Sequence, residues 1–582
     1  MNTTKSDLLT ALESLKGAFL SVGLFSFFGN LLMLTPPLYM LQLYDRVLVS
    51  RSESTLIMIT LVVLFLFATM GTLEFIRSRI LIRIGGRLER DLNERVFDAV
   101  MRLQLTGKEG GGAQPLRDLT VLRQYITGNG LFAFFDSPWV PIYLAVLYLF
   151  HVYYGLFATF AAIVILSVTL LNERRTRVPL NQANSESVKS FAQAASHLRN
   201  AEVVHAMGME RQLRERWLAG HYQFLTSQAY ASDQASIWAS TSKILRMTSQ
   251  SLMLGVGAYL VIQQELTPGM MIAGSIILGR ALAPLDILTS SWRGFSDARS
   301  SFRRLEQLLQ AIPVEEERMN LPAPQGNLSL QGVFGGPPSV ADPVLKGISL
   351  SLQKGESLGI IGPSAAGKST LARVILGVWP ARRGDVRLDG AEIANWNRVQ
   401  LGPSVGYLPQ DIELFDGTVA ENIARFGEVD PDKVVAAARL AGVHEMILEL
   451  PSGYDTVIGQ AGGVLSGGQR QRVGLARAVY GDPVLVLLDE PNSNLDDQGE
   501  RALVAALGEL KQRGATVILI THRPAVIRCV DRILVLRDGQ VQLSGTRDEV
   551  LAGLAQAQAE SARGQAPKTV PISQYGALTQ SG

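Results

Sequence analysis

The chain has 582 residues, more than one compact domain usually holds, so we expect at least two domains. It carries 54 Lys and Arg and 52 Asp and Glu, and the net charge of +2 gives no reason to expect nucleic acid as a partner. Because only 18% of the residues are charged and 47% are hydrophobic, part of the chain is expected to lie in a lipid bilayer. The one cysteine, Cys529, excludes a disulfide within the chain and lacks neighbouring ligands for a zinc site.

Six stretches before residue 290 are apolar and long enough to cross a bilayer as helices. In the core of each, charged residues are absent or, in the sixth, limited to Arg280. The third and fourth share one uncharged run, 137–172, which is too long for one helix and predicts a turn near His151. Pro268 and Gly269 predict the turn between the fifth and sixth. We therefore predict spans at about 17–41, 54–74, 134–151, 153–172, 245–264 and 267–288.

The basic residues indicate on which side of the membrane each loop lies. The loops 74–136 and 173–246 are rich in Arg and Lys, whereas the alternate loops carry only Arg46 and Arg51. Since translocation disfavours short basic loops, the amino terminus, both long loops and the carboxyl-terminal half are expected in the cytoplasm. No signal peptide is expected, because residues 1–16 are charged and no cleavage site follows an apolar run of suitable length.

The sequence pattern changes after residue 311. Residues 1–311 are expected to form an all-α transmembrane domain, in which the long basic loops either continue the membrane helices into water or form separate amphipathic helices. Residues 312–327, with several prolines and an acidic run, are predicted as a linker. Short strands then alternate with helices over 328–555, which is typical of an α/β domain with a parallel sheet. The polar tail 556–582 is predicted to be disordered.

Residues 362–369 read GPSAAGKS and fit the phosphate-loop pattern G-x-x-x-x-G-K-S/T. An expected strand at 357–361 precedes them and an expected helix follows, as this pattern requires. In such a loop the backbone N–H groups converge on phosphate oxygens, Lys368 adds a positive charge and Ser369 offers its hydroxyl to Mg²⁺. We therefore predict a nucleotide site formed by Gly362, Ser364, Ala365, Ala366, Gly367, Lys368, Ser369 and Thr370.

The apolar run 484–488 ends in Asp489 and Glu490, as expected for a buried strand that delivers two carboxylates to a sheet edge. We predict that Asp489 joins Ser369 in holding Mg²⁺, and that Glu490 polarises the water that attacks the γ-phosphorus. Alone, an acidic pair after a strand also fits a surface turn. The phosphate loop in the same chain favours the catalytic interpretation.

Residues 465–472 read LSGGQRQR, which resembles the signature sequence of ATP-binding cassette (ABC) proteins. The resemblance implies a P-loop ABC domain in which the signature serine and glycine backbone bind the γ-phosphate of a nucleotide held by the opposite subunit, at a helix N-terminus. It therefore implies a homodimer that clamps ATP through Ser466, Gly468 and Gln469. It also places Asp496 in the loop that links the two sites across the dimer.

The same resemblance assigns two further residues. Gln410, after Tyr-Leu-Pro, matches the glutamine that senses Mg²⁺, and His522 matches the switch histidine near the γ-phosphate. In isolation both are more readily structural, but in register with the other motifs they join Glu490 as expected catalytic residues. The expected metal ligands are Ser369, Gln410 and Asp489.

Two positions depart from the family pattern. The adenine-stacking tyrosine of V-x-F-x-Y-P is replaced by Gly336, which leaves Phe334 as a shifted substitute or weakens the stacking. Gln460 stands where the family often has a glutamate before the signature.

The membrane half resembles ABC exporters of one subgroup. The sequences PPLYMLQLYDRVL at 36–48 and FDSPWVP at 135–141 are similar to the ABC component of bacterial type I secretion systems that export proteases and RTX-type proteins. The likeness covers roughly residues 15–555. It implies a periplasmic adaptor, an outer-membrane channel and an unfolded protein substrate with a C-terminal signal, at the bacterial inner membrane.

We therefore expect hydrolysis of ATP to ADP and phosphate to drive protein export across the inner membrane. One alternative is a half-transporter for lipid, peptide or a hydrophobic small molecule. Another is a regulator that binds nucleotide without transport, which the full set of catalytic residues disfavours.

Overall fold

The computed structural model describes residues 7–107, 112–314, 318–459 and 464–564, and the chain forms two compact units. The first unit extends to Val314, apart from the short segment 105–108, and it is helical. The second unit holds that segment and everything from residue 315, and it contains the β-sheets. The units therefore separate within the segment 312–327, where the composition predicts a linker.

The first unit consists of helices, most of them long. In chain order they are α1 (Asp7–Ser14), α2 (Lys16–Leu32), α3 (Thr35–Gln42), the π-helical η1 (Leu43–Val47), α4 (Leu48–Ser50), α5 (Glu53–Leu105), α6 (Gln114–Thr127), α7 (Asn129–Asp136), η2 (Ser137–Trp139), α8 (Val140–Phe150), α9 (Val152–Arg199), α10 (Ala201–Ala206), α11 (Glu210–Ile262), α12 (Pro268–Ser290) and α13 (Trp292–Ala311).

Five helical segments among the described residues are long and apolar enough to cross a membrane. They are Lys16–Ser50, Glu53–Leu105, Gly130–Phe150, Val152–Arg199 and Pro268–Ser290. The fifth predicted span, 245–264, forms the end of α11 and is not among these five segments, because Arg246 and the polar run 248–251 reduce its hydropathy. This part of the chain nevertheless packs beside apolar helices, since Met253 and Leu260 belong to one buried cluster with residues of α9 and α12.

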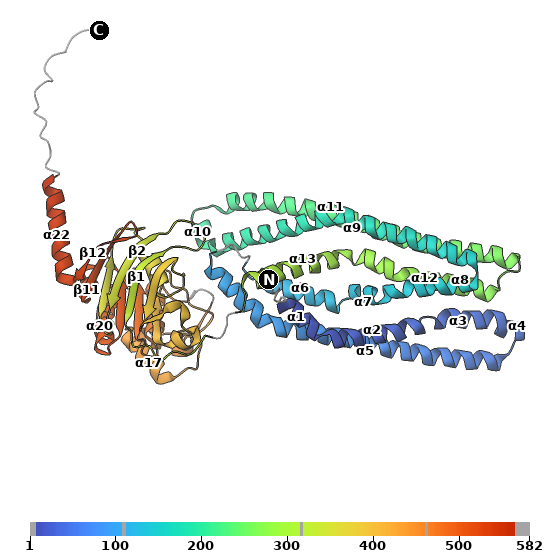
Figure 1. Ribbon diagram of the computed structural model, residues 1–582, viewed down its shortest axis with the longest axis horizontal. Coiled ribbons are helices and arrows are strands. Elements are labelled where there is room, and N and C mark those ends of the chain that lie inside the picture. Colours follow the sequence, from blue (N-terminus) through green and yellow to red (C-terminus); the bar gives the residue numbers. More distant parts are fainter. Residues whose placement is uncertain (1–6, 108–111, 315–317, 460–463, 565–582) are drawn as a thin grey trace, which may run out of the picture. The chain divides into compact units, whose positions relative to one another are not determined.

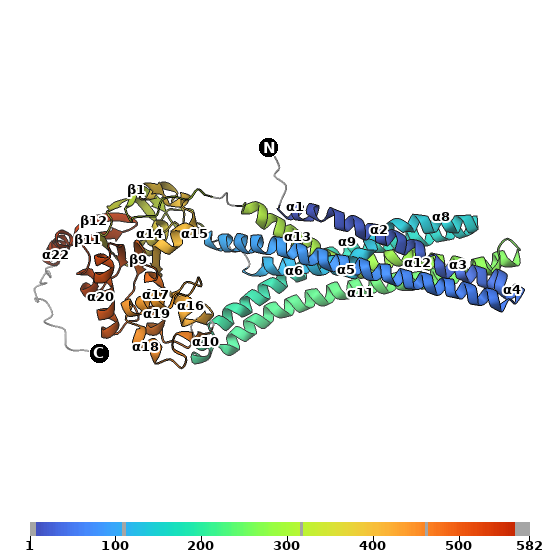
Figure 2. The ribbon, with the colours of Figure 1, turned by 90° about the horizontal axis from the view of Figure 1, so that it is seen from below.

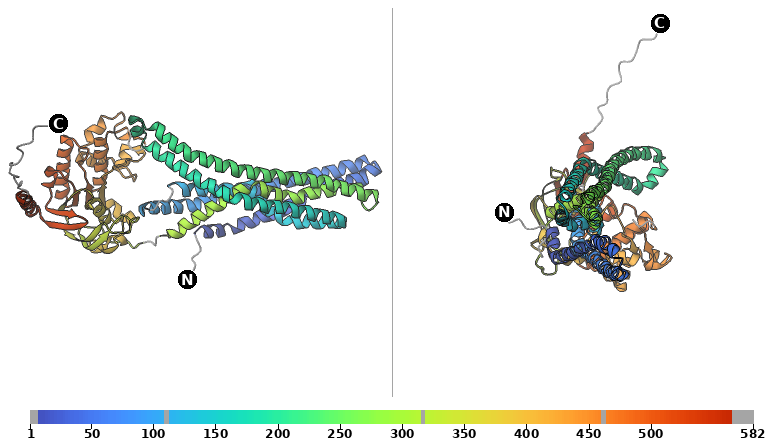
Figure 3. Two further views of the ribbon diagram at one scale, coloured as in Figure 1. Left: turned by 90° about the horizontal axis from the view of Figure 1, so that it is seen from above. Right: turned by 90° about the vertical axis from the view of Figure 1, so that its right-hand side faces the viewer.

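The long basic loops are continuations of the membrane helices. Helices α5 and α11 each have 53 residues, about 80 Å at 1.5 Å per residue, which far exceeds a bilayer core of about 30 Å. Helices α9 and α11, teal and green, lie side by side over most of their length (Figures 1 and 3). The interpretation of separate amphipathic helices is therefore wrong.

Of the two predicted turns between membrane helices, one lies at the predicted place and the other begins a few residues earlier. Helix α8 ends at Phe150 and α9 begins at Val152, so the first turn is at His151, as predicted. The turn before α12 is formed by 263–267, and Pro268 is the first residue of that helix rather than part of the turn. Proline suits the first helical position, and the Thr267 hydroxyl accepts the N–H of Met270 at 3.1 Å.

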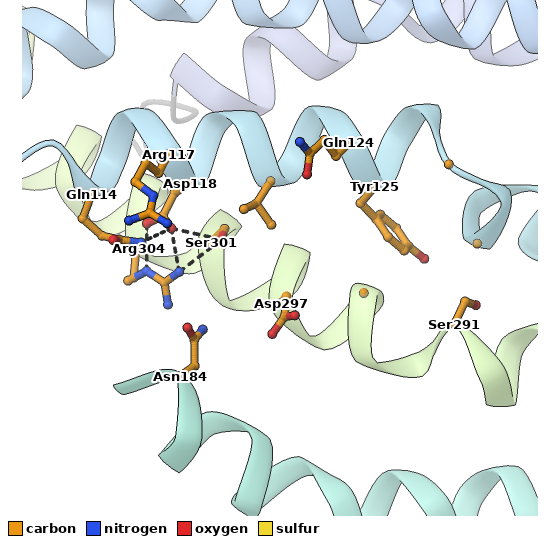
Figure 4. A pocket seen from close by; sticks show the side chains of 14 residues that line it. Gln114, Arg117, Asp118, Gln124, Tyr125, Asn184, Ser291, Asp297, Ser301 and Arg304 are labelled. Carbon is orange, nitrogen blue, oxygen red and sulfur yellow. Dashed lines mark hydrogen bonds and ion pairs between the residues drawn. The ribbon is translucent and has the colours of Figure 1, made fainter. Parts of the chain in front are cut away.

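A buried ion pair joins α6 to α13 beside a hollow of about 470 Å³ (Figure 4). Asp118 on α6 accepts two hydrogen bonds from the Arg304 guanidinium, at 2.8 and 2.7 Å. The same carboxylate also accepts from Ser301 at 3.1 Å and from Gln114 at 3.0 Å. Three of these hydrogen bonds come from α13 and fix the two helices relative to each other, whereas the bond from Gln114 lies within α6.

The second unit contains three sheets. Its strands are β1 (Leu328–Gly335), β2 (Leu345–Leu352), β3 (Ser357–Ile361), β4 (Arg383–Leu388), β5 (Ala391–Glu392), β6 (Val405–Leu408), β7 (Gly417–Thr418), β8 (Val457–Ile458), β9 (Leu485–Asp489), β10 (Thr516–Ile520), β11 (Arg532–Arg537) and β12 (Gln540–Thr546). The largest sheet has the order β12-β11-β3-β10-β9-β6, with β12 antiparallel and the other neighbours parallel. An antiparallel sheet, β2-β1-β4-β5, and the pair β7-β8 complete the unit.

Helices cover the large sheet and form a lobe beside it. They are α14 (Lys368–Ile375), α15 (Arg398–Leu401), α16 (Val419–Ile423), α17 (Pro431–Leu440), α18 (His444–Leu448), α19 (Gly467–Val479), α20 (Asp497–Gln512), α21 (Pro524–Ile527) and α22 (Arg547–Gly564). Figure 2 shows α16 to α19 gathered on one side of the unit. The helical domain followed by an α/β domain confirms the predicted fold class.

The predicted disorder after residue 555 is wrong for its first part. Helix α22 extends from Arg547 to Gly564, because Ala, Gln and Glu over 555–560 are strong helix formers. The remainder of the tail, 565–582, lies outside the described residues.

Substituting Asp118 tests the junction between α6 and α13. Asp118→Asn keeps the side-chain shape but removes the charge that four donors share, so we expect a loss of about 2 kcal/mol in stability. This value lies between about 0–1 kcal/mol for a surface pair and about 3–5 kcal/mol for a buried pair, since Asp118 is 1% exposed and Arg304 40% exposed. The thermal denaturation midpoint in detergent measures it. Asp98→Asn, an exposed site on α5, should leave the midpoint unchanged, and equal midpoints for both variants would contradict the prediction.

Candidate functional site

The predicted site residues come together at one edge of the large sheet. Strands β3, β6, β9 and β10 run parallel, so their carboxyl ends lie at the same edge. Immediately after these ends lie Gly362, Gln410, Glu490 and His522, from four distant parts of the sequence. The strands that position them are buried and apolar, and β9 and β10 have no exposed residue.

The loop between β3 and α14 has the backbone of a phosphate cradle. Ala365 and Gly367 adopt positive φ values of 64° and 100°, which curl the chain back before α14 begins at Lys368. At Gly362 a side chain is excluded, because its Cβ would lie 2.1 Å from the carbonyl oxygen of Leu536. The amide groups of this loop and of the first turn of α14, which carries Ser369 and Thr370, form the N-terminal end of a helix, where anions bind favourably.

Lys368 is buried and its ammonium group is held by the loop itself. Its Nζ donates to the carbonyl oxygens of Gly362 at 2.9 Å and Pro363 at 3.0 Å. Burial lowers the pKa of Lys368, and the nearby carboxylates of Glu490 and Asp489 oppose this shift. The amine of Lys368 therefore lies against the loop carbonyls, close enough to the two carboxylates to interact with them.

Asp489 is the last residue of β9 and is only 2% exposed. Burial raises its pKa, while a hydrogen bond from Ser369 acts in the opposite direction. Its Oδ1 atom is buried without a hydrogen-bond partner among the described residues. A carboxylate oxygen left without a donor, next to a serine hydroxyl, has the chemistry of a site for a hard divalent cation such as Mg²⁺.

Ser369 and Asp489 alone do not complete a metal centre. No group of three or more His, Cys, Asp or Glu side chains in the described ranges can hold a metal ion. This fits Mg²⁺ at a nucleotide site, because that ion takes one or two protein ligands and completes its shell with phosphate and water.

Glu490 lies between Gln410 and His522. The amide Nε2 of Gln410 donates to Oε2 of Glu490 at 3.3 Å, and Nε2 of His522 lies 4.0 Å from Oε1. The backbone of Glu490 has a positive φ of 49°, and its N–H donates to the carbonyl of Ile520 at 2.9 Å. The three residues predicted as catalytic therefore form one cluster.

The signature residues form the start of α19. Ser466 caps the helix: its hydroxyl accepts the N–H of Gln469 at 3.3 Å, and the Gln469 side chain accepts the N–H of Ser466 at 2.8 Å. Within the described chain, no hydrogen bond joins Ser466, Gly468 or Gln469 to residues 362–370. Asp496 caps α20 by accepting the N–H of Gly499 at 2.8 Å.

The remaining predicted positions have different outcomes. Gly336 is buried, and a Cβ there would lie 3.1 Å from the backbone nitrogen of Val344, so a tyrosine at this position would need the neighbouring backbone to shift slightly. Phe334 is half-buried on β1, next to Gly347, rather than on an exposed surface. Gln460 lies outside the described residues.

Sequence reasoning missed Gln471, which is 1% exposed on α19 and bonds to the backbone around Glu490. A signal was present, since a glutamine among apolar residues of a buried helix face needs a partner for its amide. The sequence did not indicate which partner that would be.

Comparison with known proteins gives consistent results for both units. Residues 19–282 match the ABC transporter transmembrane region, and residues 345–493 match the ABC transporter family. The chain is 46% identical over 550 residues to the type I secretion system ATP-binding protein PrsD of Rhizobium meliloti, covering 94% of each. It is 32% identical over 532 residues to the cyclolysin secretion/processing ATP-binding protein CyaB of Bordetella pertussis, covering 89% of this chain and 74% of CyaB.

A solved structure supports the fold. The structure of a bacterial Atm1-family ABC exporter with ATP bound superimposes with a TM-score of 0.78, covering 96% of this chain and 99% of that chain. At 24% sequence identity this similarity concerns the fold alone.

Proposed function

The chain belongs to the ABC transporter family and, within it, to the type I secretion ATP-binding proteins, and on this premise we propose that it uses ATP hydrolysis to export a protein across the bacterial inner membrane. The observation that carries the proposal is the convergence of Lys368, Asp489 and the Glu490 cluster at one sheet edge, in a chain that also has membrane-spanning helices.

The positions of the side chains support a division of labour in hydrolysis. The loop 362–370 binds the phosphates, with Lys368 exchanging the carbonyls of its own loop for phosphate oxygens. Glu490 accepts a proton from the attacking water, and Gln410 and His522, which lie beside its two oxygens, orient that water and the γ-phosphate.

The oxygens of Ser369 and Asp489 would hold Mg²⁺, with Gln410 as a further ligand. The ion would supply positive charge that neutralises the phosphate oxygens during transfer. Burial raises the pKa of Asp489, and the form of this side chain that binds a metal is the deprotonated carboxylate.

A second copy of the chain completes each nucleotide site. Ser466, Gly468 and Gln469 lie at the N-terminal end of the 13-residue α19, where amide groups favour a bound phosphate, yet they make no hydrogen bond to the phosphate loop in the described chain. We place them, with Asp496, on the nucleotide of the partner copy, so that closure of a homodimer around two ATP molecules moves the attached membrane helices.

The apolar helices make the chain a multi-pass membrane protein, and the basic residues of the long loops support a cytoplasmic position for the nucleotide-binding unit. The proposal further includes a periplasmic adaptor, an outer-membrane channel and an unfolded cargo with a C-terminal signal. Each of these comes from the membership in the type I secretion group.

Cargo stimulation of the ATPase tests the choice of substrate. The full chain in nanodiscs is titrated with the C-terminal fragment of a secreted protein encoded beside it, and separately with lipids of the host membrane. We expect the protein fragment to change kcat for ATP at least twofold at saturation. Stimulation by lipid with no response to the fragment would favour a lipid exporter instead.

Glu490→Gln tests the catalytic base. The amide keeps the size of the side chain but does not accept a proton, so we expect kcat to fall at least about 100-fold while ATP still binds. The trapped ATP should hold the chain as a dimer in size-exclusion chromatography. Glu509→Gln, on the exposed end of α20, serves as the matched control. Secretion by Glu490→Gln at the unmodified rate would remove the residue from this role.

Lys368→Met tests the phosphate cradle. Loss of one charge-assisted contact of about 1.5–3 kcal/mol should weaken ATP binding by roughly 10- to 100-fold, as measured with a fluorescent ATP analogue. Lys354→Met, an exposed lysine of the same unit, should leave the affinity unchanged. Equal affinities for both variants would contradict the assignment of the loop.

A further inference from the structure

Gln471 is a buried polar residue whose side-chain amide forms hydrogen bonds through both its nitrogen and its oxygen. Its Nε2 donates to the carbonyl oxygen of Glu490 at 3.2 Å and to the hydroxyl of Ser493 at 3.4 Å. Its Oε1 accepts the backbone N–H of Asn494 at 2.9 Å. One side chain of α19 thereby holds both ends of the segment 490–494.

The segment begins with a backbone conformation that needs support. Glu490 has a φ of 49°, a region that residues with a side chain adopt at a cost. Its N–H is fixed by Ile520, and its carbonyl accepts from both Ser493 N–H, at 3.2 Å, and Gln471. The direction of the Glu490 side chain therefore depends in part on Gln471.

The start of α19 also contacts this segment directly. A Cβ at Gly468 would lie 2.7 Å from the carbonyl oxygen of Asn494, so helix and segment approach too closely to move independently. Ser466, which the proposed dimer places on the nucleotide of the partner copy, caps the same helix. A displacement of α19 at its signature end is thus conveyed to Glu490 through a contact and a buried amide.

We propose that Gln471 is a positioning residue for ATP hydrolysis, which ties the signature end of α19 to the backbone of Glu490. The inference rests on the proposed function and deepens it. Gln471 acts through Glu490 and does not itself contact the nucleotide. In the dimer, this link makes the base of one site sensitive to the nucleotide that the same chain's signature contacts in the other site.

The test separates turnover from binding. Gln471→Met keeps the length of the side chain and removes both hydrogen-bonding groups. In full-length protein in nanodiscs, we expect kcat for ATP to fall at least tenfold while KM changes less than about twofold. Gln512→Met, the same change at an exposed position of α20, should leave both parameters unchanged.

A second variant distinguishes positioning from simple packing. Gln471→Glu retains an acceptor for Asn494 N–H but sets a carboxylate against the carbonyl of Glu490, so kcat should fall at least as far as in Gln471→Met. Gln471→Asn cannot reach both partners and should not restore turnover. Equal kcat in Gln471→Met and the unmodified chain would overturn the proposal. A fall in kcat/KM that comes from a raised KM, with kcat unchanged, would also overturn it.

A separate binding measurement distinguishes a loss of turnover from misfolding of a variant, and neither measurement requires a cargo. Binding of the fluorescent ATP analogue, expected to remain within about twofold, shows that the phosphate loop of each variant is intact. An unmodified chain without ATPase activity would refute the proposed function. If the unmodified chain is active and Gln471→Met has the same kcat, only the role of Gln471 is refuted.

Discussion

Parallel pairing of buried strands is the constraint from which the rest of the nucleotide site follows. Strands β6, β9, β10, β3 and β11 pair side by side in one direction, and burial on both faces forces them to be apolar. All polar chemistry is therefore displaced to the ends of the strands, and parallel direction brings those ends together. Four segments that are far apart in sequence meet at this edge for that reason alone.

The features that could be predicted from the sequence are those in which a local pattern has only one physical solution. The strand 357–361 has the bounds that the sequence predicts, because a short apolar run between polar turns fits a buried strand. The phosphate loop combines glycines at fixed spacing with a following helix. The membrane spans could be predicted for a similar reason, because a helix needs a minimum length of apolar sequence to cross a bilayer.

The features that sequence reasoning missed depend on partners that only the fold supplies. Pro268 is equally typical of a turn and of a first helical position, and the cap from Thr267 decides between them. Gln471 could be identified as a buried amide, but its partners lie about 20 residues further along the chain.

The contacts within a single chain also support the proposal that nucleotide binding couples to a second copy. Lys368 already has two carbonyl partners and Glu490 has the Gln410 amide, so a nucleotide replaces existing contacts, and its affinity is a difference between two sets of interactions. The buried Oδ1 of Asp489 is the atom of this cluster that has no partner to give up among the described residues. In the proposed dimer, the amides at the start of α19 add to this cluster from the partner copy. In the proposed homodimer, closure is then the step in which contacts are gained rather than exchanged, and we infer that this step moves the membrane helices.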